Sequence, residues 1–220
     1  MCFIFNYMNK ILTPDINKLE ETFPDIKNIN KSKLLMTEEG LYSVSGKVGA
    51  KFLSNIIYKN MKTTDITITD ATGNNGSDTL MLAKYYKKIN SIELDKNNFL
   101  ILKNNIQVYN FNNINLINGD SMIEIEKNNL SQDVIYIDAP WGGPDYKKHS
   151  RLKLYLGKYE LSDIYNKFKN KAKLFALKVP YNYDINNFIL KTGVNLIKTY
   201  IYKNKKKNNR IQFLILIIKN

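Results

Sequence analysis

Residues 65–83 read DITITDATGNNGSDTLMLA, and this stretch predicts the fold of the chain. Residues 65–69 alternate and are rich in β-branched side chains, which indicates a strand. The glycine-rich ATGNNG that follows indicates a loop, and residues 78–87 have the pattern of a helix. A strand that leads into a helix through such a loop is the first unit of a parallel α/β sheet.

The same alternation continues through the rest of the chain. Further strands are predicted at residues 89–94, 114–118, 133–137, 173–179, 195–203 and 210–218, and further helices at 45–60, 96–109, 121–129, 160–170 and 185–191. The last two strands flank NKKKNN at residues 204–209, which favours a hairpin. The pattern predicts an α/β, Rossmann-like fold with a mostly parallel seven-stranded sheet, helices on both faces and a C-terminal antiparallel hairpin.

The N-terminal residues 1–40 do not share this alternation. Pro14 and Pro24 divide them into short segments, which we expect to be helical. The whole chain has 220 residues, enough for one domain with a full hydrophobic core. We therefore expect an N-terminal helical lid or extension at residues 1–40 and a main domain at residues 41–220, together a minimal core with a short lid.

The charge balance is strongly basic. There are 33 Lys and Arg residues against 20 Asp and Glu residues, a formal net charge of +13. Such an excess favours a polyanionic partner such as nucleic acid. The heavy use of Asn, Lys, Ile and Tyr is explained equally well by AT-rich coding, as in a parasite or a large DNA virus, so charge alone leaves both explanations open.

Cys2 is the single cysteine and His149 the single histidine. An internal disulfide is therefore excluded, which fits a reducing intracellular compartment, either nucleus or cytoplasm. The scarcity of both residue types also argues against zinc catalysis and a Ser-His-Asp mechanism, and we expect no metal. The longest apolar run, residues 213–218, is far shorter than the ~20 residues that cross a bilayer, so we expect no membrane partner.

Ligands of open α/β sheets bind beyond the carboxyl ends of the strands, so the loops there carry the candidate site. In the first loop, Asp70 suits a cationic amino group, because an anion would be repelled by its carboxylate. Gly73 and Gly76 allow the backbone to approach a ligand closely, and Asn74 tolerates left-handed geometry. Asp70 also has a structural alternative, since turns and helix N-caps often use aspartate.

The next two strands also carry acids at or just beyond their carboxyl ends. Glu93 comes about twenty residues after the first loop, where an acid accepts from both hydroxyls of a ribose. Asp120 follows the third strand and is placed to accept from an adenine amino group. Each acid could instead be a surface or turn residue, but the ordered set predicts a pocket for S-adenosylmethionine. The predicted donor-binding residues are Asp70, Thr72, Gly73, Asn74, Gly76, Glu93, Leu94, Gly119, Asp120, Ser121 and Asp138.

The fourth loop follows a hydrophobic strand and reads DAPWGGPDY at residues 138–146. The residues Asp138, Ala139, Pro140 and Trp141 fit the pattern of amino-group methyltransferases, and we predict them as catalytic. An exocyclic base amine is a poor nucleophile because its lone pair is delocalised, so the ring must be held flat and the nitrogen aimed. Trp141 supplies a flat platform that binds a cationic ring best. It could instead be a core residue, but a buried strand or helix would not tolerate the GGPDY that follows.

The same stretch resembles the PPWGGPDY signature of the trimethylguanosine synthases, the cap-specific guanine-N2 methyltransferases. LYSVSGKVGAKFLSNII at residues 41–57 is similar to the helix that precedes the first strand in that family, and DATGNNGSDTLMLA to its methyl-donor loop. NNIQVYN and LINGD also fall in register, so that the resemblance covers roughly residues 40–182. It implies a class I S-adenosylmethionine-dependent methyltransferase that acts on N2 of the 7-methylguanosine cap of RNA, to give di- or trimethylguanosine.

The resemblance also implies a role for each part of the site. Trp141 would stack on 7-methylguanine, and the catalytic loop would face the N2 amine. The implied substrate-binding residues are Ser43, Val44, Ser45, Lys47, Trp141, Pro144, Asp145, Tyr146, Lys178, Tyr181 and Asn182.

The chain departs from the family pattern at several positions. Asp138 stands where the family usually has serine, which would make it a stronger acceptor for the amine. Family glycines are replaced by Asn74 and Ser77, and basic residues by Leu35 and Tyr181. The candidates for contacts to the cap phosphates are therefore Lys33, Lys47, Lys178 and Arg151.

Two other functions fit the same residues. Asp138 also suits an adenine-N6 or other base-amino methyltransferase of RNA or DNA, although GGPDY fits that class less well. The altered glycine loop is also compatible with a non-catalytic cap-binding module that recruits other factors.

Overall fold

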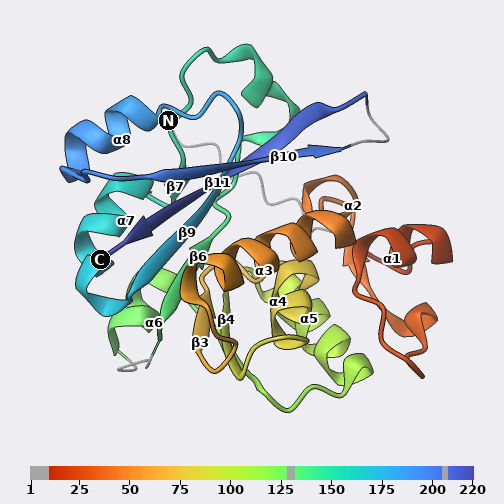
Figure 1. The fold of residues 1–220 in the computed structure, drawn as a ribbon. Helices are drawn as coiled ribbons and strands as arrows, with labels where there is room; N and C mark the ends of the chain where they lie inside the picture. The colour runs from red at the N-terminus through yellow and green to blue at the C-terminus, as the bar shows by residue number, and fades with distance from the viewer. Residues whose placement is uncertain (1–9, 128–131, 205–207) are drawn as a thin grey trace.

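The alternating strands and helices form one seven-stranded sheet in the computed structural model, which describes residues 10–127, 132–204 and 208–220 (Figure 1). Its strands are β3 (Thr67–Asp70), β4 (Lys88–Glu93), β5 (Ile114–Asn118), β6 (Val134–Ile137), β9 (Leu174–Val179), β10 (Lys198–Asn204) and β11 (Arg210–Lys219). The strand order is β10-β11-β9-β6-β3-β4-β5, in which β11 runs antiparallel to both of its neighbours. The predicted fold class is therefore confirmed, including the C-terminal antiparallel hairpin.

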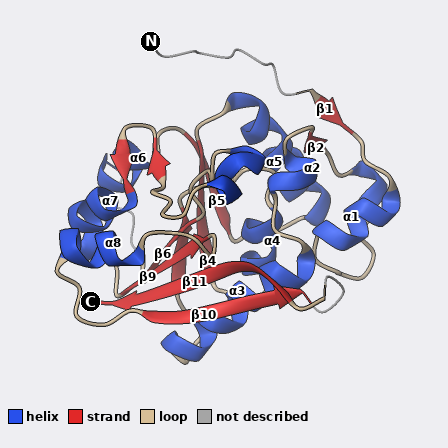
Figure 2. Cartoon of the chain, turned by 90° about the horizontal axis from the view of Figure 1, so that it is seen from above, coloured by secondary structure: helices blue, strands red, loops and turns tan. Residues whose placement is uncertain are grey.

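Two layers of helices cover the sheet (Figure 2). On one side lie α3 (Lys47–Met61), α4 (Ser77–Ala83) and α5 (Lys96–Tyr109), and on the other α6 (Ser121–Lys127), α7 (Leu161–Phe168) and α8 (Ile185–Thr192). No helix in the described ranges is long and apolar enough to span a membrane.

The central strands are buried on both faces, and alternate residues belong to different cores. In β6, Val134 and Tyr136 pack in the core that includes α3, whereas Ile135 and Ile137 pack in the core that includes α7. The residues of β9 alternate between the same two cores. Each fully buried Ile, Leu or Phe side chain stabilises the fold by about 1.5–3 kcal/mol relative to an exposed one. Because side chains alternate between the two faces of a strand, this alternation also determines which residues just beyond the strand ends lie on the same face of the sheet.

The N-terminal region is partly different from the prediction. It contains the expected helical segments, α1 (Ile16–Thr22), a 3-10 turn η1 (Lys31–Lys33) and α2 (Gly40–Ser43), but also β1 (Ile11–Leu12) and β2 (Met36–Thr37). These two short strands pair with each other, which the helical prediction missed. Leu19, Phe23 and Met36 are fully buried in a core shared with α4 and α5.

Asn105 of α5 holds the N-terminal region in place. Its side chain accepts from Leu35 N (2.9 Å) and donates to Leu35 O (2.9 Å). It also donates to Asn75 O (2.9 Å), in the glycine-rich loop. One buried amide thus joins the N-terminal region to that loop.

Most predicted element boundaries agree within a few residues, and α4 is the largest exception. The predicted helix 78–87 ends at Ala83, because the chain must turn back before β4 begins at Lys88. Tyr86 stabilises this turn, since its hydroxyl is buried and donates to Ser54 O (2.7 Å). Residues 128–129 of the predicted helix 121–129, and 205–207 of the predicted hairpin turn, lie outside the described residues.

The segment between β6 and α7 contains short elements that periodicity did not predict. They are the 3-10 helix η2 (Gly143–Lys148) and a small hairpin of β7 (Tyr155–Leu156) and β8 (Tyr159–Glu160). Gly157 at the hairpin turn has a φ of 57°, the left-handed conformation that tight hairpin turns need. A further 3-10 turn, η3 (Lys169–Lys171), follows α7.

Candidate active site

The strand order indicates a candidate ligand site. From β3 the chain proceeds to β4 and β5 on one side, whereas β6 and β9 lie on the other. The crevice at such a reversal, beyond the carboxyl ends of the strands, is the usual ligand site of this architecture. Asp70 ends β3 and Asp138 follows β6, so both acids lie at this point. Asp138 N donates to Thr72 Oγ1 (3.0 Å), which links the first and fourth predicted loops.

The first loop lies tightly against β4. Gly73 N donates to Ile92 O (2.8 Å), and a Cβ at Gly73 would lie 2.6 Å from Ser91 Oγ, which excludes a side chain there. Asn74 has a φ of 45° and Gly76 a φ of 94°. Asn74 therefore adopts a left-handed backbone conformation, which asparagine tolerates. The family that this sequence resembles has glycine at this position.

Glu93 presents a carboxylate at the end of β4. It is only 9% exposed, and each of its oxygens accepts one backbone N–H: Oε2 from Asn74 (2.7 Å) and Oε1 from Asp95 (2.8 Å). A carboxylate oxygen can accept two hydrogen bonds, so each oxygen can accept one more. Burial raises the pKa of Glu93, although these two bonds oppose the rise. Leu94 beside it is 68% exposed, which places apolar surface next to a pair of acceptors.

The third predicted loop is tied to the first two. Gly119 N donates to Glu93 O (3.0 Å), and Ser121 Oγ donates to Ala71 O. Asp120 Oδ1 accepts from Met122 N (2.8 Å) at the start of α6. Asp120 thus has the structural role of a helix-capping residue at the position predicted to meet adenine.

Asp70 is fully buried beneath the first loop. Its Oδ1 accepts from Thr72 N (3.1 Å) and its Oδ2 from Thr79 Oγ1 (2.6 Å). Burial and, to a smaller extent, the charge of Asp78 raise the pKa of Asp70 to about 7, against the opposing hydrogen bond from Thr79. The carboxyl is therefore poised between its charged and neutral forms near neutral pH.

Five polar residues next to the fourth loop are connected by hydrogen bonds, and we call them the lysine cluster: Lys178, Asp138, Ser45, Asp78 and Tyr136. Lys178 Nζ lies 2.5 Å from Asp138 Oδ2 and 2.5 Å from Ser45 Oγ. Ser45 Oγ and Tyr136 OH each donate to Asp78 Oδ2 at 2.8 Å. Burial raises the pKa of Asp138, and Lys178 opposes that rise. Burial alone would lower the pKa of Lys178, but Asp138 and Asp78 together raise it.

Trp141 is half-buried above this cluster. Its ring centroid lies 5.2 Å from that of Tyr146, nearly perpendicular at 75°, and 5.8 Å from Lys178 Nζ. The indole Nε1–H completes no hydrogen bond within the described ranges. It nevertheless lies close enough to Asp138 to lower the pKa of that carboxyl, against the larger effect of burial.

Three buried polar atoms at this edge of the sheet have no hydrogen-bond partner among the described residues: Asp78 Oδ1, Trp141 Nε1 and Asn182 Oδ1. Unpaired buried polar atoms are uncommon in folded proteins and are often explained by a ligand or water. Their position beside the fourth loop therefore indicates a binding site for a polar molecule.

Asn182 anchors the substrate loop predicted after Trp141. Its Nδ2 donates to Tyr146 O (2.8 Å) and His149 O (2.6 Å), at both ends of the last turn of η2. The Tyr146 and Tyr181 rings approach at 6.5 Å. Gly142 and Gly143, with φ of 85° and 71°, provide the left-handed turn into η2.

The other predicted substrate residues are distributed around this loop. Asp145 pairs with Lys148 (2.7 Å), and Pro144 lies within η2. Ser43 is exposed at the end of α2, and Val44 is half-buried. Ala139 is buried and Pro140 exposed.

Two of the four lysines and arginines predicted to contact phosphates are paired with carboxylates. The Lys178 side chain is 5% exposed and bonded to Asp138, so its ammonium does not face solvent. Lys47 pairs with Asp25 (2.7 Å). Lys33 and Arg151 are exposed.

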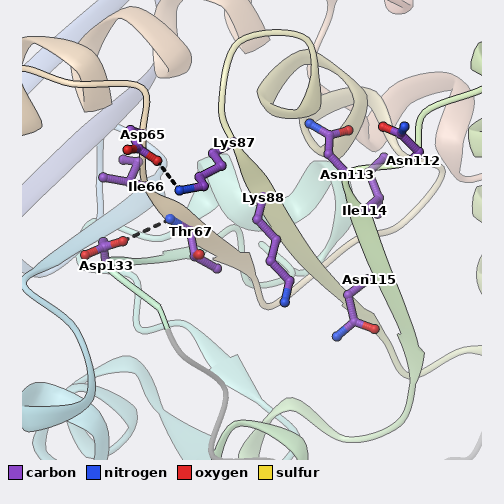
Figure 3. Close-up of a pocket in the computed structure, with 10 residues that line it drawn as sticks. All are labelled: Asp65, Ile66, Thr67, Lys87, Lys88, Asn112, Asn113, Ile114, Asn115 and Asp133. Carbon is purple, nitrogen blue, oxygen red and sulfur yellow. Dashed lines mark hydrogen bonds and ion pairs between the residues drawn. The ribbon is translucent and has the colours of Figure 1, made fainter.

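An open hollow lies at the opposite edge of the sheet, at the amino ends of the strands (Figure 3). Two of its acids already have partners: Asp65 pairs with Lys87 (2.6 Å), and Asp133 accepts from Thr67 N (2.9 Å). Because ligands of parallel α/β sheets bind at the carboxyl ends, this hollow is not the candidate active site.

The sequence contained a signal for the lysine cluster that the prediction did not use. Lys178 interrupts the otherwise apolar strand LFALKV, and a lysine in a strand buried on both faces needs a partner. Asp78 and Tyr136 carry no comparable signal, since a helical acid and a strand tyrosine are ordinary.

Proteins of similar sequence include a viral protein and a yeast enzyme. A similar viral protein is L320 of Acanthamoeba polyphaga mimivirus, 32% identical over 200 residues that span 80% of this chain and 78% of that one. The trimethylguanosine synthase of Schizosaccharomyces pombe is 27% identical over 124 residues, 54% of this chain and 52% of the yeast protein.

Solved structures share the fold at low sequence identity. A protein from Porphyromonas gingivalis W83 described as a methyltransferase has a TM-score of 0.66 at 14% identity, covering 86% of this chain and 44% of that one. Trm5b from Pyrococcus abyssi has a TM-score of 0.53 at 13% identity, covering 90% and 56%. The family model for RNA cap guanine-N2 methyltransferases matches residues 66–220, so the chain belongs to that methyltransferase family.

Proposed function

We propose that this protein transfers a methyl group from S-adenosylmethionine to the exocyclic N2 amine of the 7-methylguanosine cap of RNA. The observation that carries the proposal is Trp141 beside Asp138 at the reversal of the strand order, in a chain of this family. A flat aromatic ring next to a hydrogen-bond acceptor is the combination that a cationic purine with a weakly nucleophilic amine requires.

The residues at the carboxyl edge fit the methyl donor. Glu93, with two remaining acceptor positions and exposed Leu94 beside it, suits ribose hydroxyls and an adjoining flat ring. Asp120 would accept from the adenine amine. The loop Gly73 to Gly76 would hold the methionine end, and the buried Asp70 would support this loop through its bond with Thr72 N. When bound, the donor supplies a methyl group activated by its positive sulfur.

The remaining residues would orient the purine. Trp141 holds the ring, and Tyr146, fixed through Asn182, borders it from η2. Asp138 accepts from the N2 amine. Lys33 and Arg151 are the exposed candidates for the cap phosphates, because Lys47 and Lys178 already pair with acids.

Methyl transfer to cap nucleotides tests the proposal. We expect the protein with labelled S-adenosylmethionine to methylate m7GDP at N2, identified by mass and by chromatography against di- and trimethylguanosine standards. GDP, which lacks the ring charge, should react about 5–30-fold more slowly, because cation–π attraction of about 1–2 kcal/mol is lost. Equal rates on m7GDP and GDP would contradict the cap assignment.

A second candidate function is methylation of another base amine, such as adenine N6 in RNA or DNA. The observation that favours it is the acid at position 138, which accepts from any base amine. The same labelled donor with uncapped RNA and DNA decides between the two, since label in internal adenine would replace the cap proposal.

Replacing Glu93 by alanine is expected to weaken S-adenosylhomocysteine binding by at least 10-fold, because two charge-assisted hydrogen bonds to the ribose are lost. Isothermal titration calorimetry measures the affinity, and Glu20→Ala on the exposed surface of α1 is the matched control. Unchanged affinity would remove Glu93 from the donor site. Absence of binding by the unaltered protein would favour a non-catalytic cap-binding module.

A further inference from the structure

We propose that Lys178 is a positioning residue that holds the Asp138 carboxylate ionised and aimed at the substrate amine, so that Asp138 can take the proton released by methylation. This inference rests on the proposed function, because it concerns a base amine as acceptor. It gives Lys178 a role other than the phosphate contact predicted from the sequence.

The register of the sheet brings the two residues together. Strands β6 and β9 are parallel, and Ile137 is paired with Leu177, so Asp138 and Lys178 are the next pair along. By the period of two, both side chains lie on the side where Tyr136 packs towards α3 and α4. The ion pair is therefore placed by two neighbouring buried strands, since Lys178 lies in β9 and Asp138 directly follows β6.

The ammonium of Lys178 is enclosed by protein. It donates to Asp138 Oδ2 and to Ser45 Oγ, both at 2.5 Å, and lies 5.1 Å from the centroid of the Phe213 ring. Ser45 in turn donates to Asp78, so that one chain of hydrogen bonds leads from Lys178 to α4. These partners fix the position of the ammonium, whereas an unpaired buried charge would destabilise the fold.

Asp138 lies between this lysine and the open edge of the site. Its side chain is 19% exposed against 5% for Lys178. The lysine bonds Oδ2, which leaves Oδ1 as the oxygen that can face a substrate amine. Lys178 thus fixes the carboxylate through Oδ2, and Oδ1 remains for the substrate amine.

The proton balance shows why the charge of Asp138 matters. As the amine lone pair forms the new N–C bond, the C–S bond breaks and its electron pair goes to sulfur. The nitrogen then carries a positive charge until one N–H proton moves to the Asp138 carboxylate, and the resulting acid returns the proton to solvent. A protonated Asp138 could not take part in this step.

Burial and the neighbouring acid Asp78 favour protonation of Asp138, whereas Lys178 and the Trp141 indole oppose it. The ionisable groups around it are Asp70 on β3, Asp78 on α4, Tyr136 on β6 and Lys178 on β9, and the Trp141 indole lies beside it. Among these groups, Lys178 is the cation. Without its charge, burial and the two neighbouring acids would keep Asp138 protonated at higher pH.

Lys178→Met tests the inference, because methionine retains length and apolar volume but has no charge. We expect kcat at pH 7 to fall about 100-fold, the size of a general-base contribution, with S-adenosylhomocysteine affinity unchanged. The acid limb of the kcat–pH profile should move up by more than one pH unit, so that activity recovers at high pH. Lys178→Arg should restore part of the activity. Lys173 is an exposed lysine directly before the same strand, and Lys173→Met should leave the profile unchanged.

A double variant separates positioning from general damage to the fold. If Lys178 acts through Asp138, Lys178→Met combined with Asp138→Asn should be no slower than Asp138→Asn alone. An unshifted pH profile in Lys178→Met, or additive losses in the double variant, would overturn the inference.

A measurement without substrate distinguishes this inference from the proposed function. In protein labelled with ¹³C at Asp carboxyls, the Asp138 resonance, assigned with Asp138→Asn, should titrate at higher pH in Lys178→Met than in the unaltered protein. A shifted titration with no methylation of m7GDP would refute only the cap substrate. An Asp138 titration that is the same in both proteins would refute the role of Lys178, whatever the substrate.

Discussion

Replacing Trp141 by alanine is expected to lower kcat/KM on m7GDP by about 10²–10³-fold. Stacking of a base on an aromatic ring contributes about 1–3 kcal/mol, and cation–π attraction in a desolvated site about 2 kcal/mol, so their joint loss reaches that range. The effect on GDP should be smaller, because the neutral ring gains only the stacking part. Initial rates on the two nucleotides measure both effects.

Trp141→Phe is the matched control, since it retains a flat ring with a weaker π-face and should lose about 10-fold. Trp141 is also half-buried against both cores, so thermal unfolding of each variant must accompany the kinetics. If Trp141→Ala kept the rate and the preference for m7GDP over GDP, the indole would be a packing residue and not a platform.

Replacing Asp70 by asparagine is expected to stabilise the protein at high pH. Burial raises the pKa of Asp70 from 3.8 to about 7, so between these values the folded state binds a proton that the unfolded state has released. The free energy of unfolding therefore falls by about 1.4 kcal/mol per pH unit as pH rises through this window. Relative to the unaltered protein, Asp70→Asn should gain roughly 3 kcal/mol more at pH 8 than at pH 5.

The hydrogen bonds around Asp70 can accommodate the amide. Thr79 Oγ1 lies 2.8 Å from Ser91 Oγ, and either hydroxyl can be the donor of that bond. Thr79 can therefore turn its hydrogen to Ser91 and accept from the new amide, while Asn Oδ1 still accepts from Thr72 N. Urea unfolding followed by circular dichroism at the two pH values measures the difference.

Asp133→Asn provides a control of opposite sign. Burial alone would raise the pKa of Asp133, but its bonds with Lys173 and Thr67 N lower it overall. Its contribution to stability is therefore present above the unfolded pKa and is lost as pH falls, so the asparagine variant should be less stable at neutral pH. Equal pH slopes for Asp70→Asn and the unaltered protein would show that Asp70 titrates normally.

The sequence was sufficient to predict the architecture because that information is local. Alternation in strands and the 3.6-residue period in helices are visible within short windows, and α5 and β5 have the predicted boundaries. The prediction was wrong at the end of α4. The pattern of residues 84–87 is compatible with a helix, but the chain leaves the helix after Ala83 in order to reach β4. The two-stranded sheet of β1 and β2 was missed because its strands are too short for a periodic pattern.

In the candidate site, too, some features follow from the sequence and others only from the tertiary structure. The position of Glu93 at the end of its strand and the GGPDY motif after Trp141 are matters of order along the chain, and the sequence by itself determined them. Only the tertiary structure decided the partners of Lys178. The lysine and Asp138 are 40 residues apart, and their contact depends on which strands are neighbours and on how deeply both are buried. Burial converts an apparently free cation into one that must be paired, and no short window of sequence contains that information.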